Sequence, residues 1–430
     1  MKFILFALVI VMTFLEGKSL FWQDISFLYN KFLNFVIPKD FDLIRVRKID
    51  PTKRINNAEV LDFIGLVGQY NYPAEEHNVT TEDGYNLVIH RIPESPLLNN
   101  KKKKKVVFIL HGIMLSSDNW VLYGPGKDLA FLLADQGYDV WIGNMRGNTY
   151  CRSHANMTVY DPKFWQYSFH EVGTKDLPAM FDYIFNHTKQ KDLYYIGYSM
   201  GGTSLFVLLS IKPEYNTKIK MAICLAPPVF HMEATFTVKE MFNRLPILKE
   251  ILGKHEIYDF APQSLTTVTV ARMLCNDNAI TQVICIAVFF FIAGPDPKQL
   301  NTTTLPDIIS HCPAGTSIQT LEHYHQNMLM NDFRNYDYGI AENYKRYKQE
   351  MPPRYDLKKV TAPIILFSAE NDMLVPEKNI LELSKHLPNV LLTEKVPYKF
   401  FNHLDFMWAI DAKSLVYDRM LELIQKFDTN

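Results

Sequence analysis

The sequence predicts an α/β fold with a mostly parallel central sheet and an inserted, mainly helical cap. The first observation is a set of short apolar runs without clean alternation, which is typical of strands buried on both faces. These runs are VVFIL (106–110), YDVWIG (138–143), LYYIGY (193–198) and KMAICLA (220–226). The second observation is that helical patterns separate the runs, as the crossover connections of a parallel sheet require.

The elements at either end of the sheet have signals of their own. VTTEDGYNLVIHRI (79–92) alternates apolar and polar residues around Asp83-Gly84, which indicates a hairpin and therefore an antiparallel edge. Among the helical patterns, GKDLAFLLAD stops at Gly137, and DLPAMFDYIFNHT has a proline near its start. Later strands are expected in two segments, APIILFSAEND (362–372) and NVLLTEKVPY (389–398).

After about Asn216 the strand-helix alternation lapses for over a hundred residues, which predicts the inserted cap. Within it, VICIAVFFFIAG (283–294) is too short to span a bilayer. We expect a buried helix there, with an apolar wall facing lipid as the alternative. The predicted domains are a signal peptide (1–17), an N-terminal segment (18–59), a first core part (60–215), a helical cap or lid (216–345) and a second core part (346–430).

The N-terminus predicts that the chain enters the secretory pathway. MKFILFALVIVMTFLEG has a lysine, an apolar stretch and then small and polar residues, as a secretory signal does, with an uncleaved anchor as the alternative. Asn-x-Ser/Thr sequons, which are acceptors for N-glycosylation, agree with this route. They lie at Asn78, Asn156, Asn186 and Asn301.

Charge and cysteine content narrow the function classes. Lys+Arg 45 against Asp+Glu 46 gives a formal charge of -1, so no basic footprint for nucleic acid exists. Of the five cysteines, Cys275 and Cys285 bracket a short loop and are the expected disulfide, whereas Cys224 is expected to be a buried small hydrophobe. No Cys or His cluster indicates a metal, and His323 and His325 are interpreted as surface residues.

A candidate nucleophile, Ser199, lies in the stretch LYYIGYSMGGTS. Its G-x-S-x-G motif follows an apolar strand and precedes a helical pattern, which is the context of the nucleophile in an α/β-hydrolase. A serine hydroxyl needs a histidine to accept its proton, and the histidine needs a carboxylate to fix its tautomer. These partners are expected later in the chain, the acid before the histidine.

Position in the chain selects the acid and the base. Asp372 directly follows a predicted strand, so it should reach the same sheet edge as Ser199, and His403 follows the next strand. The alternatives are Asp356, Asp405 and His386, each expected to be a cap or a surface residue.

Two backbone N–H groups should stabilise the oxyanion. We expect them at Met200, directly after the nucleophile, and at Ile113, after the sharp turn His111-Gly112. His111 itself is expected to have a structural role in that turn.

Several stretches together resemble the acid lipase family, which includes gastric and lysosomal acid lipases. They are EEHNVTTEDGYNLVIHRIP, VVFILHGI, GYDVWIGNMRGNTY, GYSMGGTS, PAGTSIQ, END (370–372) and NHLDF. The resemblance implies a glycoprotein, secreted or alternatively lysosomal, that hydrolyses triacylglycerols or steryl esters without a cofactor. It places the triad on Ser199, Asp372 and His403 and the oxyanion donors on Ile113 and Met200.

The chain departs from this family beside the nucleophile. Tyr198 stands where the family usually has histidine, and Met200 where it often has glutamine. We expect Met200 to preserve activity, because the backbone makes the oxyanion hole, and Tyr198 to reshape the acyl pocket.

The leading interpretation is a lipase that acts on lipid esters at an oil-water or membrane interface. The alternatives are an esterase for small soluble esters and a lipid-binding protein without catalysis. An intact Ser-Asp-His set argues against the last. The sequence predicts no oligomeric state.

Overall fold

The computed structural model describes residues 45–48, 59–98, 104–277 and 279–429. The predicted signal peptide, most of the segment 18–59 and the start of the lysine run 101–105 lie outside these residues. None of the described helices has the length and apolar character needed to cross a bilayer.

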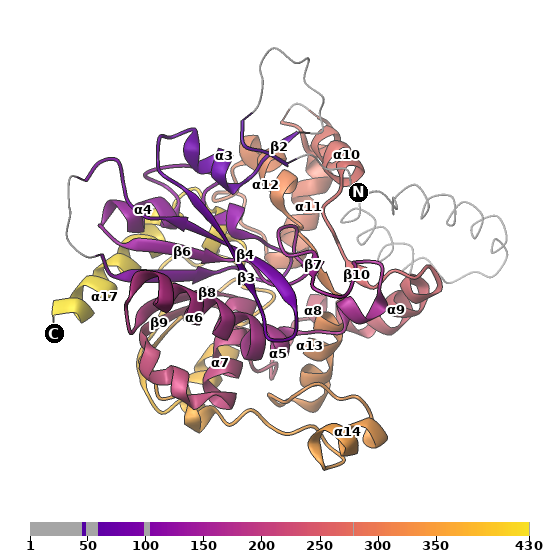
Figure 1. The fold of residues 1–430 in the computed structure, drawn as a ribbon. Coiled ribbons are helices and arrows are strands. Elements are labelled where there is room, and N and C mark those ends of the chain that lie inside the picture. The colour runs from indigo at the N-terminus through magenta and orange to yellow at the C-terminus, as the bar shows by residue number, and fades with distance from the viewer. Residues whose placement is uncertain (1–44, 49–58, 99–103, 278, 430) are drawn as a thin grey trace.

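A nine-stranded sheet forms the centre of the molecule (Figure 1). Its order is β13-β12-β9-β8-β5-β6-β4-β3, with β7 beside β4. Neighbours from β13 to β6 run parallel, whereas β4 is antiparallel to β6 and β3. The strands are β3 Glu75–Thr80, β4 Tyr85–Ile92, β5 Val106–Leu110, β6 Asp139–Gly143, β7 Ser153–His154, β8 Leu193–Tyr198, β9 Ile219–Leu225, β12 Ile364–Ser368 and β13 Val390–Lys395. This confirms the mostly parallel sheet, and the β3-β4 hairpin confirms the antiparallel edge.

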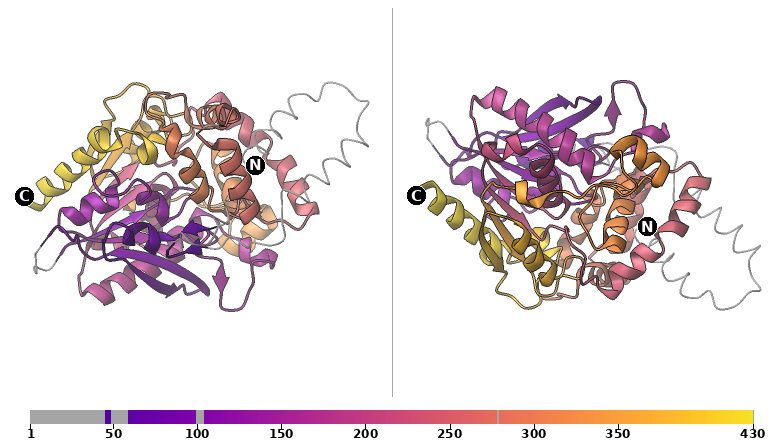
Figure 2. Two further views of the ribbon diagram at one scale, coloured as in Figure 1. Left: turned by 90° about the horizontal axis from the view of Figure 1, so that it is seen from above. Right: turned by 90° about the horizontal axis from the view of Figure 1, so that it is seen from below.

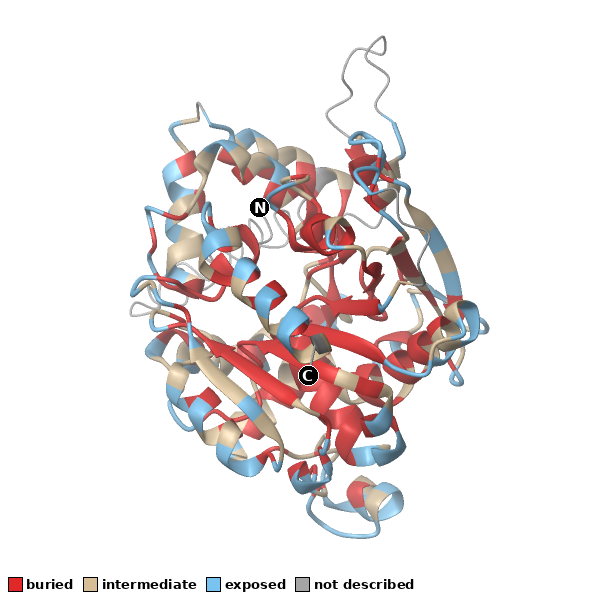
Figure 3. Cartoon of the chain, turned by 90° about the vertical axis from the view of Figure 1, so that its left-hand side faces the viewer, coloured by how far each residue is buried: buried red, intermediate tan, exposed pale blue. Residues whose placement is uncertain are grey.

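Burial explains why the central runs lack alternation. Every residue of β5, β6, β8 and β12 is buried, because helices cover both faces of the sheet (Figure 3). The edge strand β13 is half-buried to exposed along its length. Hydrophobic burial on both faces therefore fixes the strands that carry the site.

The core helices flank this sheet, and Figure 2 shows them from two further sides. They are α3 Phe63–Gly68, α4 Leu129–Asp135, α5 Phe169–Glu171, α6 Leu177–Thr188, α7 Met200–Ile211, α15 Glu377–His386, α16 Asp405–Trp408 and α17 Asp418–Thr429. Two of them confirm sequence expectations: α4 ends shortly before Gly137, which has a φ of +86°, and α6 has Pro178 in its first turn.

Six helices between β9 and β12 gather on one side of the sheet, and we call them the cap helices (Figure 1). They are α8 Phe236–Asn243, α9 Leu245–Lys254, α10 Leu265–Cys275, α11 Gln282–Ala293, α12 Leu305–His311 and α13 Ile318–Met330. A further helix, α14 Ile340–Tyr347, follows them. Because β9 belongs to the sheet, the helical insertion begins after Leu225, which corrects the predicted start at residue 216.

Helix α11 corrects the expectation for VICIAVFFFIAG. It is a helix, but it is not buried all round, since Val283 is 64% exposed and Ile284 and Phe291 are also exposed. Its other face, with Cys285 and Val288, lines a cavity described below. The apolar run therefore has one face toward the interior and one toward solvent.

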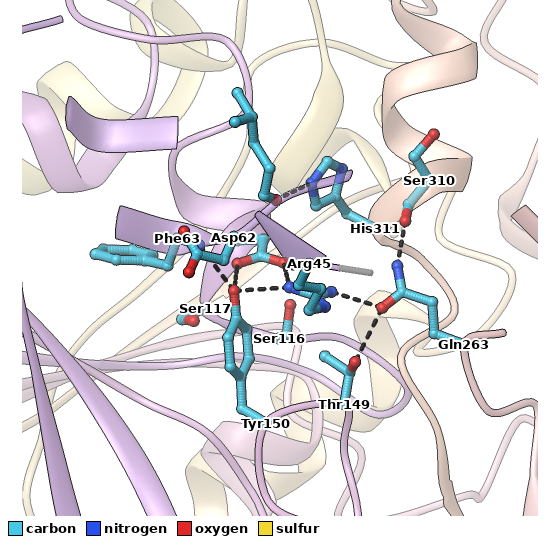
Figure 4. A network of polar contacts seen from close by, with 12 residues as sticks. Arg45, Asp62, Phe63, Ser116, Ser117, Thr149, Tyr150, Gln263, Ser310 and His311 are labelled. Atoms are coloured by element: carbon cyan, nitrogen blue, oxygen red, sulfur yellow. Dashed lines mark hydrogen bonds and ion pairs between the residues drawn. The ribbon is translucent and has the colours of Figure 1, made fainter. Parts of the chain in front are cut away.

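A partly buried polar network joins the cap helices to the core (Figure 4). The Arg45 guanidinium donates to Asp118 and to the Tyr150 hydroxyl, each at 2.7 Å, and to Gln263 at 2.5 Å. Gln263 in turn donates to the carbonyl of Ser310 in α12. Residues from the start of the described chain, the core and the cap thus share one set of hydrogen bonds.

Candidate active site

Ser199 occupies the turn between β8 and α7, as the G-x-S-x-G context predicts. Its φ of +50° and ψ of -119° are unusual for a residue with a side chain, and such strained turns are characteristic of nucleophile positions. The flanking glycines make the turn possible. A Cβ on Gly197 would lie 2.6 Å from Tyr195 Cε1, and one on Gly201 would lie 2.5 Å from the Leu110 carbonyl oxygen.

Asp372 and His403 form a buried pair at the same end of the sheet. His403 Nδ1 lies 2.7 Å from Asp372 Oδ2. The other oxygen, Oδ1, accepts from the backbone N–H groups of Leu374 at 2.8 Å and Val375 at 2.7 Å. These two backbone hydrogen bonds hold the carboxylate in place. The carboxylate in turn fixes the imidazole with Nδ1–H toward Asp372, which leaves Nε2 to accept a proton.

The alternative acids and bases lie in other environments. Asp356 is exposed and caps a turn by accepting from Lys358 N at 3.2 Å, and His386 is exposed on α15. Asp405 corrects the expectation of a surface position: it is buried, and its side-chain oxygen accepts from the Asn402 backbone N–H at 2.7 Å.

Both ring nitrogens of His111 are hydrogen-bonded to backbone atoms. Its Nδ1 lies 2.7 Å from the Gly112 carbonyl oxygen, and its Nε2 accepts from Met145 N at 3.2 Å. Burial lowers its pKa to about 4, so the ring is neutral and both nitrogens are occupied. A structural role follows from these contacts.

Ser199 and His403 lie on the wall of one cavity, with a volume of about 210 Å³. The rest of the wall is almost entirely apolar, and half of its residues come from the cap helices. Cap residues on the wall are Val238, Met241, Phe242, Thr267, Ala271, Cys275, Cys285, Val288, Phe289, Ile292, Ile309, Leu321 and Tyr324. The serine and histidine therefore face an apolar chamber roofed by the cap helices.

The two predicted oxyanion donors are at this edge as well. Ile113 lines the cavity just after β5, where a Cβ on Gly112 would lie 3.1 Å from Ser199 Cβ. Met200 is the first residue of α7, so its N–H has no acceptor within the helix. Among the described hydrogen bonds, none joins the Ser199 hydroxyl to His403, a contact that commonly forms only when substrate is bound.

The expected disulfide is present. Cys275 at the end of α10 is bonded to Cys285 in α11, with their Cα atoms 5.8 Å apart. Both residues are on the cavity wall, so the bond joins two helices of the cavity roof. Cys224 is buried in β9, as expected.

The histidine pair of the cap corrects a sequence interpretation. His323 is fully buried rather than on the surface: it stacks on Phe169 with ring centroids 3.9 Å apart and bonds to Ser168 Oγ at 2.8 Å. Burial lowers its pKa to about 3. His325 is half-buried and stacks on Phe242. No signal in EHYHQN distinguishes the two environments.

The sequons and one histidine cluster lie away from the cavity wall. Asn78, Asn156 and Asn186 are exposed, whereas Asn301 is half-buried and accepts hydrogen bonds from Thr303 of the same sequon.

Among the described residues, Glu75, His77 and His187 offer ligand atoms within 4.8 Å of one another. The Arg91 guanidinium lies between them, 2.9 Å from Glu75 and 3.3 Å from His187, so a cation already occupies this cluster.

The fold and the site define an α/β-hydrolase. Residues 105–407 match the family model described as alpha/beta hydrolase fold, and residues 64–124 match the partial alpha/beta-hydrolase lipase region. Bovine gastric triacylglycerol lipase is 36% identical over 363 residues, covering 84% of this chain and 90% of the relative. Human lysosomal acid lipase/cholesteryl ester hydrolase is 34% identical, covering 89% and 94%. The chain belongs to this acid lipase family.

A solved structure agrees on the fold alone. A protein from Sulfolobus solfataricus superposes with a TM-score of 0.55 at 15% sequence identity, covering 82% of this chain and 94% of that one.

Proposed function

We propose that the protein is a lipase that hydrolyses carboxylic ester bonds of lipids through an acyl-enzyme on Ser199. The observation that carries the proposal is the pairing of His403 with Asp372 at 2.7 Å, with Ser199 and His403 on the wall of one apolar cavity. Its family membership supports the same chemistry.

The proposed reaction has two halves. Ser199 Oγ bonds to the ester carbonyl carbon while its proton passes to His403 Nε2, and Asp372 stabilises the resulting imidazolium. The backbone N–H groups of Ile113 and Met200 stabilise the oxyanion. The ester C–O bond then breaks and the alcohol leaves with the proton from His403. Water repeats the sequence on the acyl-enzyme, releasing the fatty acid and restoring the serine.

The cavity supports a lipid as the substrate. Its apolar wall suits an acyl chain, because burying each methylene contributes about 0.8 kcal/mol. The relatives are named for triacylglycerol and cholesteryl ester, and we propose esters of this class as substrates. A small soluble ester would leave much of this wall in contact with water.

An exposed apolar surface supports action at an oil-water or membrane interface. We define the outer apolar patch as the exposed large apolar residues of α10, α11 and their connection. They are Met273, Ile280, Val283, Ile284 and Phe291. Ile280 is 96% exposed. Since exposed apolar patches mark binding surfaces, we propose that this patch contacts the lipid phase while the cap helices roof the cavity.

The proposed location is outside the cytoplasm, either secreted or lysosomal. The disulfide between Cys275 and Cys285 is of a kind that persists in oxidising compartments. We further propose that the sequons at Asn78, Asn156, Asn186 and Asn301 carry glycans. The mass lost on enzymatic deglycosylation tests this.

The function is tested with the purified protein on emulsified triacylglycerol, emulsified cholesteryl ester and a short soluble ester, with Ser199→Ala alongside. We expect hydrolysis of an emulsified lipid that Ser199→Ala loses. Activity that survives in Ser199→Ala would overturn the mechanism. A rate confined to the soluble ester would favour the esterase instead.

A further inference from the structure

Tyr198, the last residue of β8, contacts the proposed catalytic base. Its hydroxyl donates to the backbone carbonyl oxygen of His403 at 2.8 Å. Its ring lies 5.1 Å from the His403 imidazole, centroid to centroid, with 36° between the planes. The residue immediately before the proposed nucleophile is therefore bonded to the residue that should activate it.

The same ring also contacts the loop of the oxyanion donor. A Cβ on Gly112 would lie 3.1 Å from both Cδ1 and Cε1 of Tyr198, as close as it would be to Ser199 Cβ. Gly112 directly precedes Ile113. Tyr198 thus lies against three parts of the site, namely the nucleophile turn, the oxyanion loop and the histidine loop.

The hydroxyl can serve as a permanent donor. Tyr198 is buried, and burial raises its pKa well above the ordinary value, so the hydroxyl keeps its proton across the working range of an enzyme. His403 belongs to the segment between β13 and α16, which has no regular ladder of its own. The preceding residue, Asn402, is held by its side-chain amide, which donates to the Gly294 carbonyl oxygen at 2.9 Å. At His403 itself, the Tyr198 hydroxyl supplies the hydrogen bond to the backbone carbonyl oxygen.

We infer that Tyr198 is a positioning residue that fixes His403 relative to Ser199 and the oxyanion loop. This inference rests on the proposed function. Tyr198 was expected to act on the acyl pocket, and its ring does line the cavity. Its hydroxyl, however, is bonded to the histidine backbone, so removing it should affect kcat more than substrate binding.

The test replaces Tyr198 with Phe, which removes only the hydroxyl. Tyr194→Phe is the matched control: Tyr194 is a buried tyrosine of the same strand, and its hydroxyl donates to Asp428 in the C-terminal helix. A net hydrogen bond of about 1 kcal/mol corresponds to roughly fivefold, so we expect Tyr198→Phe to lower kcat about fivefold with KM within about twofold. Tyr194→Phe should keep kcat within about twofold.

A second readout separates positioning from loss of folded protein. Rates are expressed per active site titrated to completion with an alkyl phosphonate, so that unfolded molecules are not counted. The acid limb of the kcat/KM profile should move to lower pH in Tyr198→Phe, because a less well-aligned Asp372 stabilises the imidazolium less.

The outcomes distinguish the two proposals. If Ser199→Ala is inactive and Tyr198→Phe has wild-type kcat and pH profile per titrated site, the positioning role is wrong while the proposed function stands. An equal loss in Tyr194→Phe would also overturn it. Activity in Ser199→Ala would remove the proposed function itself.

Discussion

The Asp372 carboxylate lies 2.7 Å from His403 Nδ1, and its second oxygen is held by the N–H groups of Leu374 and Val375. The carboxylate therefore cannot rotate away from the imidazole without breaking two further hydrogen bonds. A buried, pre-oriented pair of this kind sets the tautomer that a serine nucleophile requires.

Replacing Asp372 with Asn tests this arrangement. An amide can donate to Nδ1 and so favours the wrong tautomer, and we expect kcat to fall by about 10³- to 10⁴-fold. Asp356→Asn, the other aspartate near β12, should keep its rate because it only caps an exposed turn. Initial rates on one ester measure both. A large loss in Asp356→Asn with little change in Asp372→Asn would reverse the assignment.

The pH dependence of stability should include Asp405. Burial, with the Asp296 and Asp372 carboxylates nearby, raises its pKa from 3.8 to about 8. The folded protein thus keeps a proton that the unfolded chain releases above about pH 4, so stability is lost as pH rises toward 8. In Asp405→Asn this contribution is absent. We expect Tm of the variant relative to wild type to rise by several degrees between pH 4.5 and 8; a difference that is constant with pH would contradict the assignment.

The disulfide should stabilise the cavity roof. Closing its ten-residue loop contributes about 2.5 kcal/mol in the chain-entropy model, so replacing Cys275 and Cys285 with Ser should lower Tm. Dithiothreitol should lower the Tm of wild type and of the control Cys312→Ser, whose free cysteine is on the same wall. It should leave the double variant unchanged. Equal sensitivity in all three proteins would exclude this contribution.

The outer apolar patch predicts a substrate-dependent defect. Changing Val283 and Ile284 to Ser removes apolar surface without touching Ser199 or His403. We expect activity on emulsified lipid to fall about thirtyfold, since the two residues together contribute on the order of 2 kcal/mol of burial, while soluble-ester activity is retained. Leu97→Ser, an exposed leucine in the β4-β5 connection, is the control. An equal loss on both substrates would argue against interfacial contact.

Much of the core can be predicted from the sequence, because strands that are buried on both faces are continuous apolar runs. VVFIL and LYYIGY could be assigned as central strands, and the ends of the later strands in APIILFSAEND and NVLLTEKVPY then place Asp372 and His403 at the same sheet edge as Ser199. Cys275 and Cys285 are only ten residues apart in the chain, so their disulfide could also be predicted from local spacing. Each of these inferences uses contacts between neighbours in the chain or along one sheet edge.

Other features depend on contacts between distant segments. His323 is buried because Phe169 and Ser168, more than 150 residues earlier, pack on it. Composition made VICIAVFFFIAG look like a buried helix, yet only tertiary packing decides which face is covered. The bond from Tyr198 to His403 joins residues 205 apart, so no local pattern could reveal it.

The central claim is tested most directly by reacting the protein with an alkyl p-nitrophenyl phosphonate and locating the adduct by peptide mass spectrometry. The account predicts one adduct, on Ser199, formed in step with the loss of esterase activity and strongly slowed in His403→Ala. An adduct on another residue, or full activity with Ser199 modified, would contradict it.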